Sequence, residues 1–457
     1  MDEPTIEEWM DRHHVEVVRT HATNLDGLVV GKYLNRYKFL KSLPHGHSMA
    51  DLGLAMDLSG MPHLTFWHDF RHAMIGDIQL RPDMDTIISD GTDPDLGHII
   101  CDFTGVDGSE IRLCPRTLLK DVTRQIADEG FSVKAAFELE FFLFKNSFDT
   151  ARRREYRHLE PVGASTQQNI YFARNAYHAK PFMDEVIKRL NWQKFEWESW
   201  SDEGGVGQVE LNFPPADPVR AADTISRVKQ IIYEVAVDRE MSVSFMAQIA
   251  PGYANGLHIH HSLQKADGSS AFLEAGGRSP LFHHWIAGIL ASMPGATSIL
   301  CPTINAYRRL KEFSAPPTAA TWGEENKSAA LRVITRSDSL ARIEHRLASG
   351  DANPYLALAA VLAGGLAGWQ QRLSPPDELN EMAWGLPEDH ERLPNSIMRA
   401  ADALDKDTLL ASVLGKDVVD YWVNTRKLEW LSFHSDGADP ESPEPTPWEY
   451  RRYFELM

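Results

Sequence analysis

The ten residues AAFELEFFLF, numbers 135–144, constrain this chain more than any other stretch. They contain no glycine or proline and are mostly aromatic or aliphatic, which is typical of a buried β-strand. Side chains two residues apart on a strand point to the same face, so Glu138 and Glu140 share one face of an otherwise apolar strand. A buried carboxylate without a partner is strongly unfavourable. We therefore expect the fold to bring partners to both groups.

The composition indicates a globular chain that is too long for one small core. Its 457 residues are 43% hydrophobic and 24% charged, and the length suggests roughly two or three domains. The formal net charge of −19 argues against nonspecific nucleic-acid binding and against an anionic membrane surface. It does not exclude anionic substrates, because local clusters of arginine can override the global sign.

The sequence carries no sign of export or of a membrane span. The N-terminal stretch MDEPTIEEWMDRHH is acidic and lacks the apolar core of a signal peptide. The most apolar runs, near residues 284–293 and 354–369, fall short of a convincing membrane span. The three cysteines lie far apart without CxxC spacing, which argues against structural zinc and a disulfide framework. We expect a cytoplasmic protein.

The pattern of turns and periodic segments divides the chain into two domains. Short strand-like runs separated by turn residues extend to about Asp107 and predict a small sheet-rich domain over 1–107. Helical and strand patterns then alternate, which predicts a large mixed domain over 108–457. Its first helix is expected at 114–130, with Pro115 in the first turn. A helix at 218–241 and a strand at 242–250 follow.

Three further segments place polar groups at a spacing of two residues. Gln208 and Glu210 lie on an alternating run, with Glu203 across a glycine-rich bend. The other two segments contribute His258 with His260, and Arg342, Glu344 and Arg346. Each pattern alone has an ordinary explanation, such as a salt-bridged surface, a packing histidine or a solvated run of charges.

Together these segments predict one charged site. Carboxylate oxygens with one or two imidazoles suit Mg²⁺ or Mn²⁺ better than structural zinc. Nearby arginines suit phosphate or carboxylate substrates. We therefore predict a paired divalent-metal site that neutralises a nucleoside triphosphate during phosphoryl transfer. The chain has no GxxxxGK[ST] motif, so side chains and metal would hold the phosphates instead of a glycine-rich loop.

The order of the motifs resembles the glutamine synthetase family over nearly the whole chain. The segments that carry the resemblance are ELE (138–140), E-x6-E (203–210), GLHIHHSL (256–263), PTINAYRRL (302–310), NKSAALRV (326–333), RIEHR (342–346) and NPYLALAA (353–360). The resemblance implies an α+β fold: an N-terminal β-grasp domain, then a catalytic domain with a curved, mainly antiparallel sheet flanked by helices. It also implies a homo-oligomer, usually a dodecamer of two hexameric rings with active sites between subunits.

The resemblance implies an ATP-dependent reaction in two steps. ATP would phosphorylate the γ-carboxylate of L-glutamate, and a nitrogen nucleophile would then displace phosphate to leave an amide. Two or three Mg²⁺ or Mn²⁺ ions per site are expected, one held by Glu140, Glu203 and Glu210, and a second by Glu138, His258 and Glu344. ATP would contact Glu198, His260, Ser262, Arg332 and Arg342. Glutamate would contact Arg309, Arg346, Tyr253 and Gly256. Lys327, where an arginine is usual, joins Arg309, Arg346 and Asp57 in the catalytic set.

The departures from the family pattern concern the amine side of the reaction. Ammonium-using members carry a glutamate just before Ala-Pro in the loop that follows the substrate arginine, and here Ser314 occupies that place. Glu312 lies two residues earlier and is expected to face differently. A carboxylate at this place would favour the binding and deprotonation of ammonium, so its absence argues against ammonium as the substrate. With a serine at this position, the chain instead resembles the glutamate–amine ligases of the family, which use polyamines, ethanolamine, alkylamines or anilines.

Other positions bear on the amine and on regulation. Candidates for an amine pocket are Ser314, Trp322, Asp57 and Phe66, although each aromatic residue could equally belong to the core. Trp384 stands where adenylylated enzymes carry a tyrosine, so this control is not expected. Two alternatives stay open: an ammonium-dependent glutamine synthetase, and a non-catalytic member of the family that retains only the fold.

Overall fold

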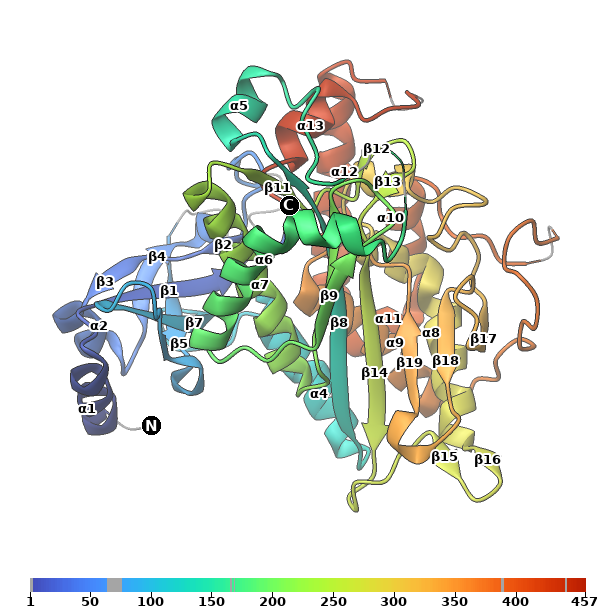
Figure 1. Ribbon diagram of the computed structural model, residues 1–457. Coiled ribbons are helices and arrows are strands. Elements are labelled where there is room, and N and C mark those ends of the chain that lie inside the picture. Colours follow the sequence, from blue (N-terminus) through green and yellow to red (C-terminus); the bar gives the residue numbers. More distant parts are fainter. Residues whose placement is uncertain (1–2, 64–75, 165–166, 168, 388–389, 440–441) are drawn as a thin grey trace.

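Figure 1 shows a small N-terminal unit packed against a larger unit that contains the rest of the chain. The computed structural model describes residues 3–63, 76–164, 167, 169–387, 390–439 and 442–457. Within these residues, no helix is both long enough and apolar enough to cross a bilayer. The expected division at residue 107 falls in the connection between the last N-terminal strand and the first long helix.

A mixed sheet forms the centre of the N-terminal unit. Its strands run in the order β2-β1-β7-β5-β4, with β3 paired to β1 and β6 paired to β7. The pairing of β1 with β7 is parallel, and the other pairings are antiparallel. A mixed sheet accompanied by helices is the arrangement that the β-grasp expectation requires. The elements are α1 (Glu3–His13), β1 (Val17–Thr23), β2 (Val29–Val30), β3 (Tyr33–Asn35), α2 (Arg36–Ser42), β4 (His47–Ala50), β5 (Asp77–Pro82), β6 (Ile88–Ser89) and β7 (Leu96–Thr104).

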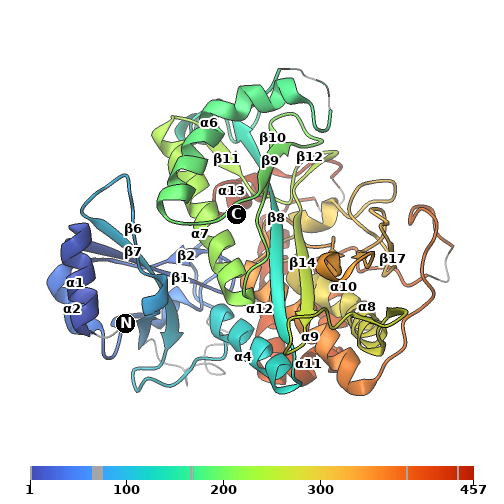
Figure 2. The same cartoon turned by 60° about the horizontal axis from the view of Figure 1, so that its bottom comes forward.

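A curved sheet forms the centre of the larger unit, and β8 (Ser132–Phe144) is an interior strand of this sheet, between β14 and β10. The order is β17-β18-β19-β14-β8-β10-β9, with β11 also paired to β8, and only the β17–β18 pairing among these is parallel. Figure 2 shows β8 and β14 running side by side through this unit. The other strands are β9 (Ser199–Asp202), β10 (Gln208–Asn212), β11 (Ser242–Ser244), β14 (Leu257–Gln264), β17 (Trp322–Glu324), β18 (Leu331–Ile334) and β19 (Arg342–His345). Two hairpins lie outside it: β12 (Gln248–Ala250) with β13 (Tyr253–Ala254), and β15 (Leu273–Glu274) with β16 (Gly277–Arg278).

Helices flank this sheet, and glycines allow two of them to pack closely. A Cβ added at Gly288 of α8 would lie 2.1 Å from the carbonyl oxygen of Gly364 of α9. The contact therefore requires a residue without a side chain at this point. The helices are α4 (Pro115–Asp128), α5 (Phe148–Arg153), α6 (Ala173–Trp192), α7 (Pro218–Asp238), α8 (Pro280–Leu300), α9 (Pro354–Gln371), α10 (Ile397–Asp405), α11 (Thr408–Leu414), α12 (Lys416–Ser435) and α13 (Pro447–Tyr453).

Helix α4 forms as its sequence pattern predicts. Pro115 occupies the first turn, where its missing N–H is not needed. The apolar positions Leu118, Leu119, Val122 and Ile126 are all buried. Gly130 follows the helix with a φ of +90°, a conformation that glycine adopts without strain.

One arginine joins the two units. Arg116 of α4 is buried and donates to Asp102 of β7 at 3.0 Å and to Asp83 of the N-terminal unit at 2.8 Å. Its Nε also donates to Asp223 of α7 at 2.8 Å. Three carboxylates from both units therefore surround a single guanidinium, which fixes the N-terminal unit on the larger unit of the same chain.

The segment 242–250 differs from the single strand expected from its pattern. It forms two short strands, β11 and β12, separated by residues 245–247. The N–H of Phe245 bonds the carbonyl of C-terminal Met457, and the N–H of Gln248 bonds the side chain of Asn305. Partners distant in the sequence thus break the strand. The preceding helix ends at Asp238, earlier than expected, and Glu240 then adopts a φ of +53°.

Candidate active site

The register of four neighbouring strands places the predicted charged residues beside one another. Glu140 of β8 pairs with Glu210 of β10, and Glu138 pairs with His258 of β14. One strand further, His260 pairs with Glu344 of β19. Because each side chain shares a face with those two residues away, the polar groups of these strands converge on one surface of the sheet.

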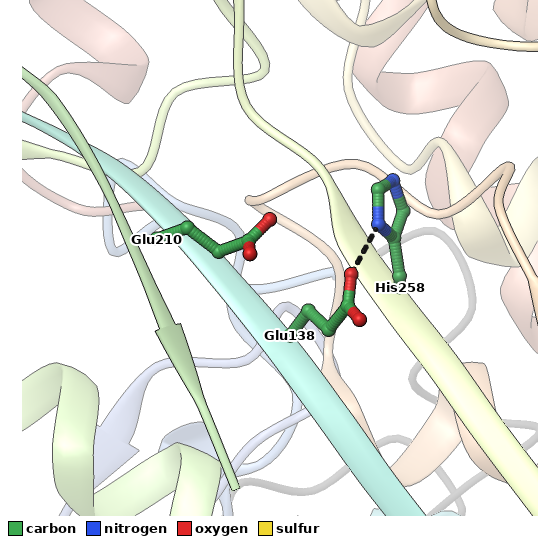
Figure 3. A group of neighbouring side chains, drawn as sticks. All are labelled: Glu138, Glu210 and His258. Atoms are coloured by element: carbon green, nitrogen blue, oxygen red, sulfur yellow. Dashed lines mark hydrogen bonds and ion pairs between the residues drawn. The ribbon is translucent and has the colours of Figure 1, made fainter. Parts of the chain in front are cut away.

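Three overlapping groups of ligand-type atoms result. Within each group the atoms lie within 4.8 Å of one another, and the groups are Glu140 with Glu203 and Glu210; Glu138 with Glu210 and His258; and Glu138 with His260 and Glu344. Figure 3 shows Glu138, Glu210 and His258 pointing toward one another from three strands. The first group is the set expected for one metal. In the second expected set, His258 Nδ1 lies 2.9 Å from Glu138 and 4.0 Å from Glu344, while His260 also enters the cluster.

The electrostatics of this cluster favour a bound cation. Burial and the nearby carboxylates of Glu140 and Glu210 raise the pKa of Glu203 to about 8. Burial together with Glu138 and Glu140 raises the pKa of Glu210 to about 7. At Glu138, burial acts in the same direction, but hydrogen bonds with His258 and His260 outweigh it and lower the pKa.

One orphaned atom supports the same conclusion. Glu203 Oε2 is buried and has no hydrogen-bond partner among the described residues. A carboxylate oxygen in that position is unfavourable unless a cation or a water satisfies it. Closely spaced, mostly oxygen ligands with one or two imidazoles fit Mg²⁺ or Mn²⁺. The residues present therefore suit a divalent metal.

Arginines border the cluster and are themselves incompletely satisfied. Glu344 is 1% exposed and bonds Arg332 at 2.9 Å as well as Arg346. Arg309 is 4% exposed and donates to the carbonyl of Leu347, the residue after Arg346. The Nε atoms of Arg309 and Arg346 are buried without a partner in the described part of the chain. Two guanidiniums with unused donors fit an anionic ligand such as a carboxylate.

A cavity of about 360 Å³ adjoins the cluster at Glu138. Four of the residues expected to contact ATP line it: Glu198, His260, Ser262 and Arg342. Arg342 Nε also donates to His260 Nδ1 at 3.4 Å. The fifth expected residue, Arg332, lies on β18 and bonds Glu344 and Glu325 instead of lining this cavity.

Two of the four residues expected near glutamate, Tyr253 and Gly256, lie just before β14. The N–H of Gly256 donates to Glu140 Oε2 at 2.7 Å. A Cβ at Gly256 would lie 3.0 Å from His258 Nε2 and 3.1 Å from Glu140 Oε1, so glycine allows this close approach. Tyr253 is half-buried, and its ring centroid lies 6.1 Å from that of Phe142.

The structure does not bring the amine-pocket candidates together within one chain. Trp322 is a core residue, because its ring packs against Phe282 and Arg278 and its indole donates to the carbonyl of Pro376. Asp57 lies on the N-terminal unit and accepts from Arg452 of α13 at 3.0 Å. Within one chain, Trp322 therefore belongs to the core. The position of Asp57 leaves its expected role open, because the family resemblance implies sites between subunits. Phe66 lies outside the described residues.

The loop that carries Ser314 is held by its neighbours. The Ser314 hydroxyl donates to the carbonyl of Arg309 at 3.2 Å. Glu312 is held by other groups: it pairs with Arg392 and accepts from the N–H of Gly385 at 3.1 Å. Lys327, expected in the catalytic set, is exposed in the connection between β17 and β18.

Sequence reasoning missed one residue near the cluster. Tyr171, in the loop before α6, is 62% exposed and has a φ of +56°. Partial burial and the carboxylates of Glu210 and Glu203 raise the pKa of its phenol, which indicates that the ring lies near the acidic cluster. No periodicity or spacing links this loop residue to the strands, so the pattern analysis contained no signal for it.

Comparison with known proteins agrees with this fold and site. Residues 112–453 match the family model of the glutamine synthetase catalytic domain. The chain belongs to the glutamine synthetase family, and as such it is an ATP-dependent ligase. It is 32% identical to the γ-glutamylethanolamide synthetase GlnA4 of Streptomyces coelicolor, over 97% of this chain and 93% of that protein. It is 27% identical to a glutamate–isopropylamine ligase of a Pseudomonas species, over 99% and 98%. A solved complex of GmaS with ADP superposes with a TM-score of 0.83, at 25% identity and 98% coverage of both chains.

Proposed function

We propose that the protein joins the γ-carboxylate of L-glutamate to an organic amine through γ-glutamyl phosphate, releasing ADP and phosphate. The observation that carries the proposal is the acidic cluster on β8, β10, β14 and β19 and the bend at Glu203, bordered by arginines with unused donors. The relatives named for ethanolamide and isopropylamide synthesis support an organic amine as the nitrogen donor.

In this proposal the acidic cluster holds two or three Mg²⁺ or Mn²⁺ ions. Glu140, Glu203 and Glu210 would hold one ion, and Glu138, His258 and Glu344 would hold a second. When bound, the ions would offset the negative charge of the ATP phosphates and of the glutamate carboxylate. The raised pKa values of Glu203 and Glu210 support this, because the carboxylates repel one another without a cation.

The substrates would occupy the two sides of the cluster. ATP would lie in the cavity at Glu198, His260, Ser262 and Arg342, with Arg332 and Arg342 near its phosphates. Lys327 would belong to the catalytic set. Arg309 and Arg346 would bind the carboxylates of glutamate through their unused Nε donors. Tyr253 and Gly256 would complete the glutamate side.

On the amine side, the loop offers a hydroxyl where a carboxylate would favour ammonium. Ser314 bonds the loop backbone, and Glu312 is held by Arg392 and Gly385. Asp57 does not reach this chain's own cluster, so we propose that it acts in a neighbouring copy's site within a ring-shaped homo-oligomer. The N-terminal unit of one subunit would then form part of the amine pocket of the next.

A release assay with an amine panel tests the proposal. Phosphate release from ATP is measured with glutamate and Mg²⁺ in the presence of ammonium, methylamine, isopropylamine, ethanolamine, putrescine, spermine or aniline. Mass spectrometry identifies the γ-glutamyl product. Turnover with an organic amine and little with ammonium is the expected result. Ammonium as the best substrate would make the protein a glutamine synthetase, and no turnover with any amine would reject the proposed reaction.

A further inference from the structure

The side chain of Gln208, at the start of β10, is 4% exposed and uses both ends of its amide. Its Oε1 accepts from the N–H of Gly205 at 2.9 Å. Its Nε2 donates to Glu140 Oε2 at 3.0 Å and to the carbonyl of Ala254 at 2.7 Å, with Asn255 Oδ1 at 3.2 Å. The partners fix the orientation of the amide, because only the NH₂ group can face acceptors and only the oxygen can face an N–H.

These contacts determine how Glu140 is presented. Oε2 of Glu140 receives two neutral donors, Gln208 Nε2 and the N–H of Gly256. Oε1 remains on the side of the cluster, 3.9 Å from His258 Nε2. One oxygen is therefore fixed by hydrogen bonds while the other is left for the group that the cluster binds.

Gln208 also connects Glu140 to the bend that carries Glu203. The backbone of the bend closes on the same residue: Glu203 N–H donates to the carbonyl of Gln208 at 3.1 Å, and Gln208 N–H donates to the carbonyl of Gly205 at 3.0 Å. Its amide at the same time contacts the segment that leads into β14. A single buried side chain thus joins three segments, each of which presents a residue of the cluster.

We propose that Gln208 is a positioning residue for the divalent cation and not one of its ligands. It would hold the carboxylates of Glu140 and Glu203 in place before the cation arrives, which reduces the reorganisation that binding requires. The inference rests on the proposed metal site. Outer groups that hydrogen-bond a metal ligand typically contribute about 10–100-fold to metal affinity.

The test measures Mn²⁺ affinity of the metal-stripped full-length protein, without nucleotide or amine, by electron paramagnetic resonance of free Mn²⁺. Gln208→Glu keeps the shape and the acceptor for Gly205 but turns an acceptor toward Glu140 and Ala254. Gln208→Met removes the same donors without adding a charge. We expect both variants to raise the Kd for Mn²⁺ by about tenfold or more.

Gln193 provides a matched control far from the cluster. It is 2% exposed, its Nε2 donates to a carboxylate oxygen of Asp90 at 3.3 Å, and its Oε1 accepts from Arg227 at 2.8 Å. Gln193→Glu therefore makes the same chemical change in an equally buried place. We expect it to lower the melting temperature while leaving the Kd for Mn²⁺ within about twofold of the wild type.

The outcomes separate this inference from the proposed function. If the wild type binds no Mn²⁺, the metal site itself is wrong. If the wild type binds Mn²⁺ and the Gln208 variants bind it equally well, the positioning role is wrong. If Gln193→Glu weakens Mn²⁺ binding as much as the Gln208 variants do, the effect comes from general instability. If Gln208→Glu binds Mn²⁺ more tightly than the wild type, residue 208 lies within ligand distance of the cation. Both results would overturn the inference.

Discussion

His21 Nε2 and His98 Nδ1 lie 2.9 Å apart on the parallel strands β1 and β7, in the buried junction between the two units. His98 Nε2 donates to Asp90 at 2.8 Å, and Arg227 Nη1 of α7 lies 3.4 Å from His21 Nδ1, the nitrogen that is left to accept from it. Gln193 closes the ring of contacts by bridging Arg227 and Asp90. Two neutral imidazoles satisfy this arrangement, because each can donate from one nitrogen and accept at the other.

This ring predicts a loss of stability in mild acid. Burial and Arg227 lower the pKa of His21 well below 6.5, and burial also lowers that of His98 despite the hydrogen bond to Asp90. The folded state disfavours the protonated imidazoles of His21 and His98. Their contribution to the free energy of unfolding is therefore complete above about pH 6.5 and decreases as the pH falls below it. Chemical denaturation between pH 7.5 and 5 should show a smaller pH dependence for His21→Asn than for the wild type. An identical slope in both proteins would contradict this. His45→Asn, at an exposed position, is the control.

Removing a carboxylate from the cluster should abolish the reaction without changing the size at which the protein elutes. Glu140→Ala is expected to reduce turnover by at least about 100-fold, because it removes a proposed metal ligand. Steady-state kinetics and size-exclusion chromatography measure the two properties. Glu8→Ala, at an exposed residue of α1, should leave both unchanged. Near-normal activity of Glu140→Ala would refute the assignment of the site.

Two adjacent arginines should respond differently to the same change. Arg309→Lys keeps the charge but loses the planar fork, so the KM for glutamate should rise about tenfold while the KM for ATP changes little. Arg308 instead bonds Glu449 at 2.7 and 2.9 Å, away from the cluster. Arg308→Lys should lower the melting temperature and leave the KM for glutamate near the wild-type value. If Arg308→Lys raised the KM for glutamate and Arg309→Lys lowered only the melting temperature, the assignment of Arg309 to glutamate binding would be wrong.

A carboxylate in the Ser314 loop should shift the preference for the nitrogen donor. Ser314→Glu is expected to raise the ratio of kcat/KM for ammonium to that for the best organic amine by about tenfold, because a carboxylate favours ammonium binding and deprotonation. Glu312→Gln should not change this ratio, since Glu312 is already paired with Arg392. If the ratio is unchanged in Ser314→Glu, this loop does not determine the choice of nitrogen donor.

The alternation of strand side chains predicted the pairs of residues that share a face. Glu138 with Glu140 and His258 with His260 follow from geometry within one strand. The register between strands is different. Glu138 and His258 are 120 positions apart in the sequence, so a local pattern does not predict that they lie side by side. The order of family motifs supplied that information instead.

The misplaced residues show what local pattern cannot predict. Trp322 was a pocket candidate because it is aromatic, but Phe282 and Arg278 cover it, and both lie about 40 positions earlier in the chain. Gln208 was grouped with metal-type ligands by its spacing from Glu210. Its amide instead contacts Glu140 and backbone groups of the bend at Gly205 and of β13, whose positions only the folded chain determines.

The three carboxylates around Arg116 limit how this enzyme can be recombined with its relatives. An N-terminal unit exchanged to alter the amine pocket must bring its own equivalents of Asp83 and Asp102, or it leaves a buried guanidinium short of charge. The catalytic segment expressed without that unit would meet the same difficulty. For chimera design, the N-terminal unit is therefore not a freely separable module, because Asp83 and Asp102 must stay matched to Arg116.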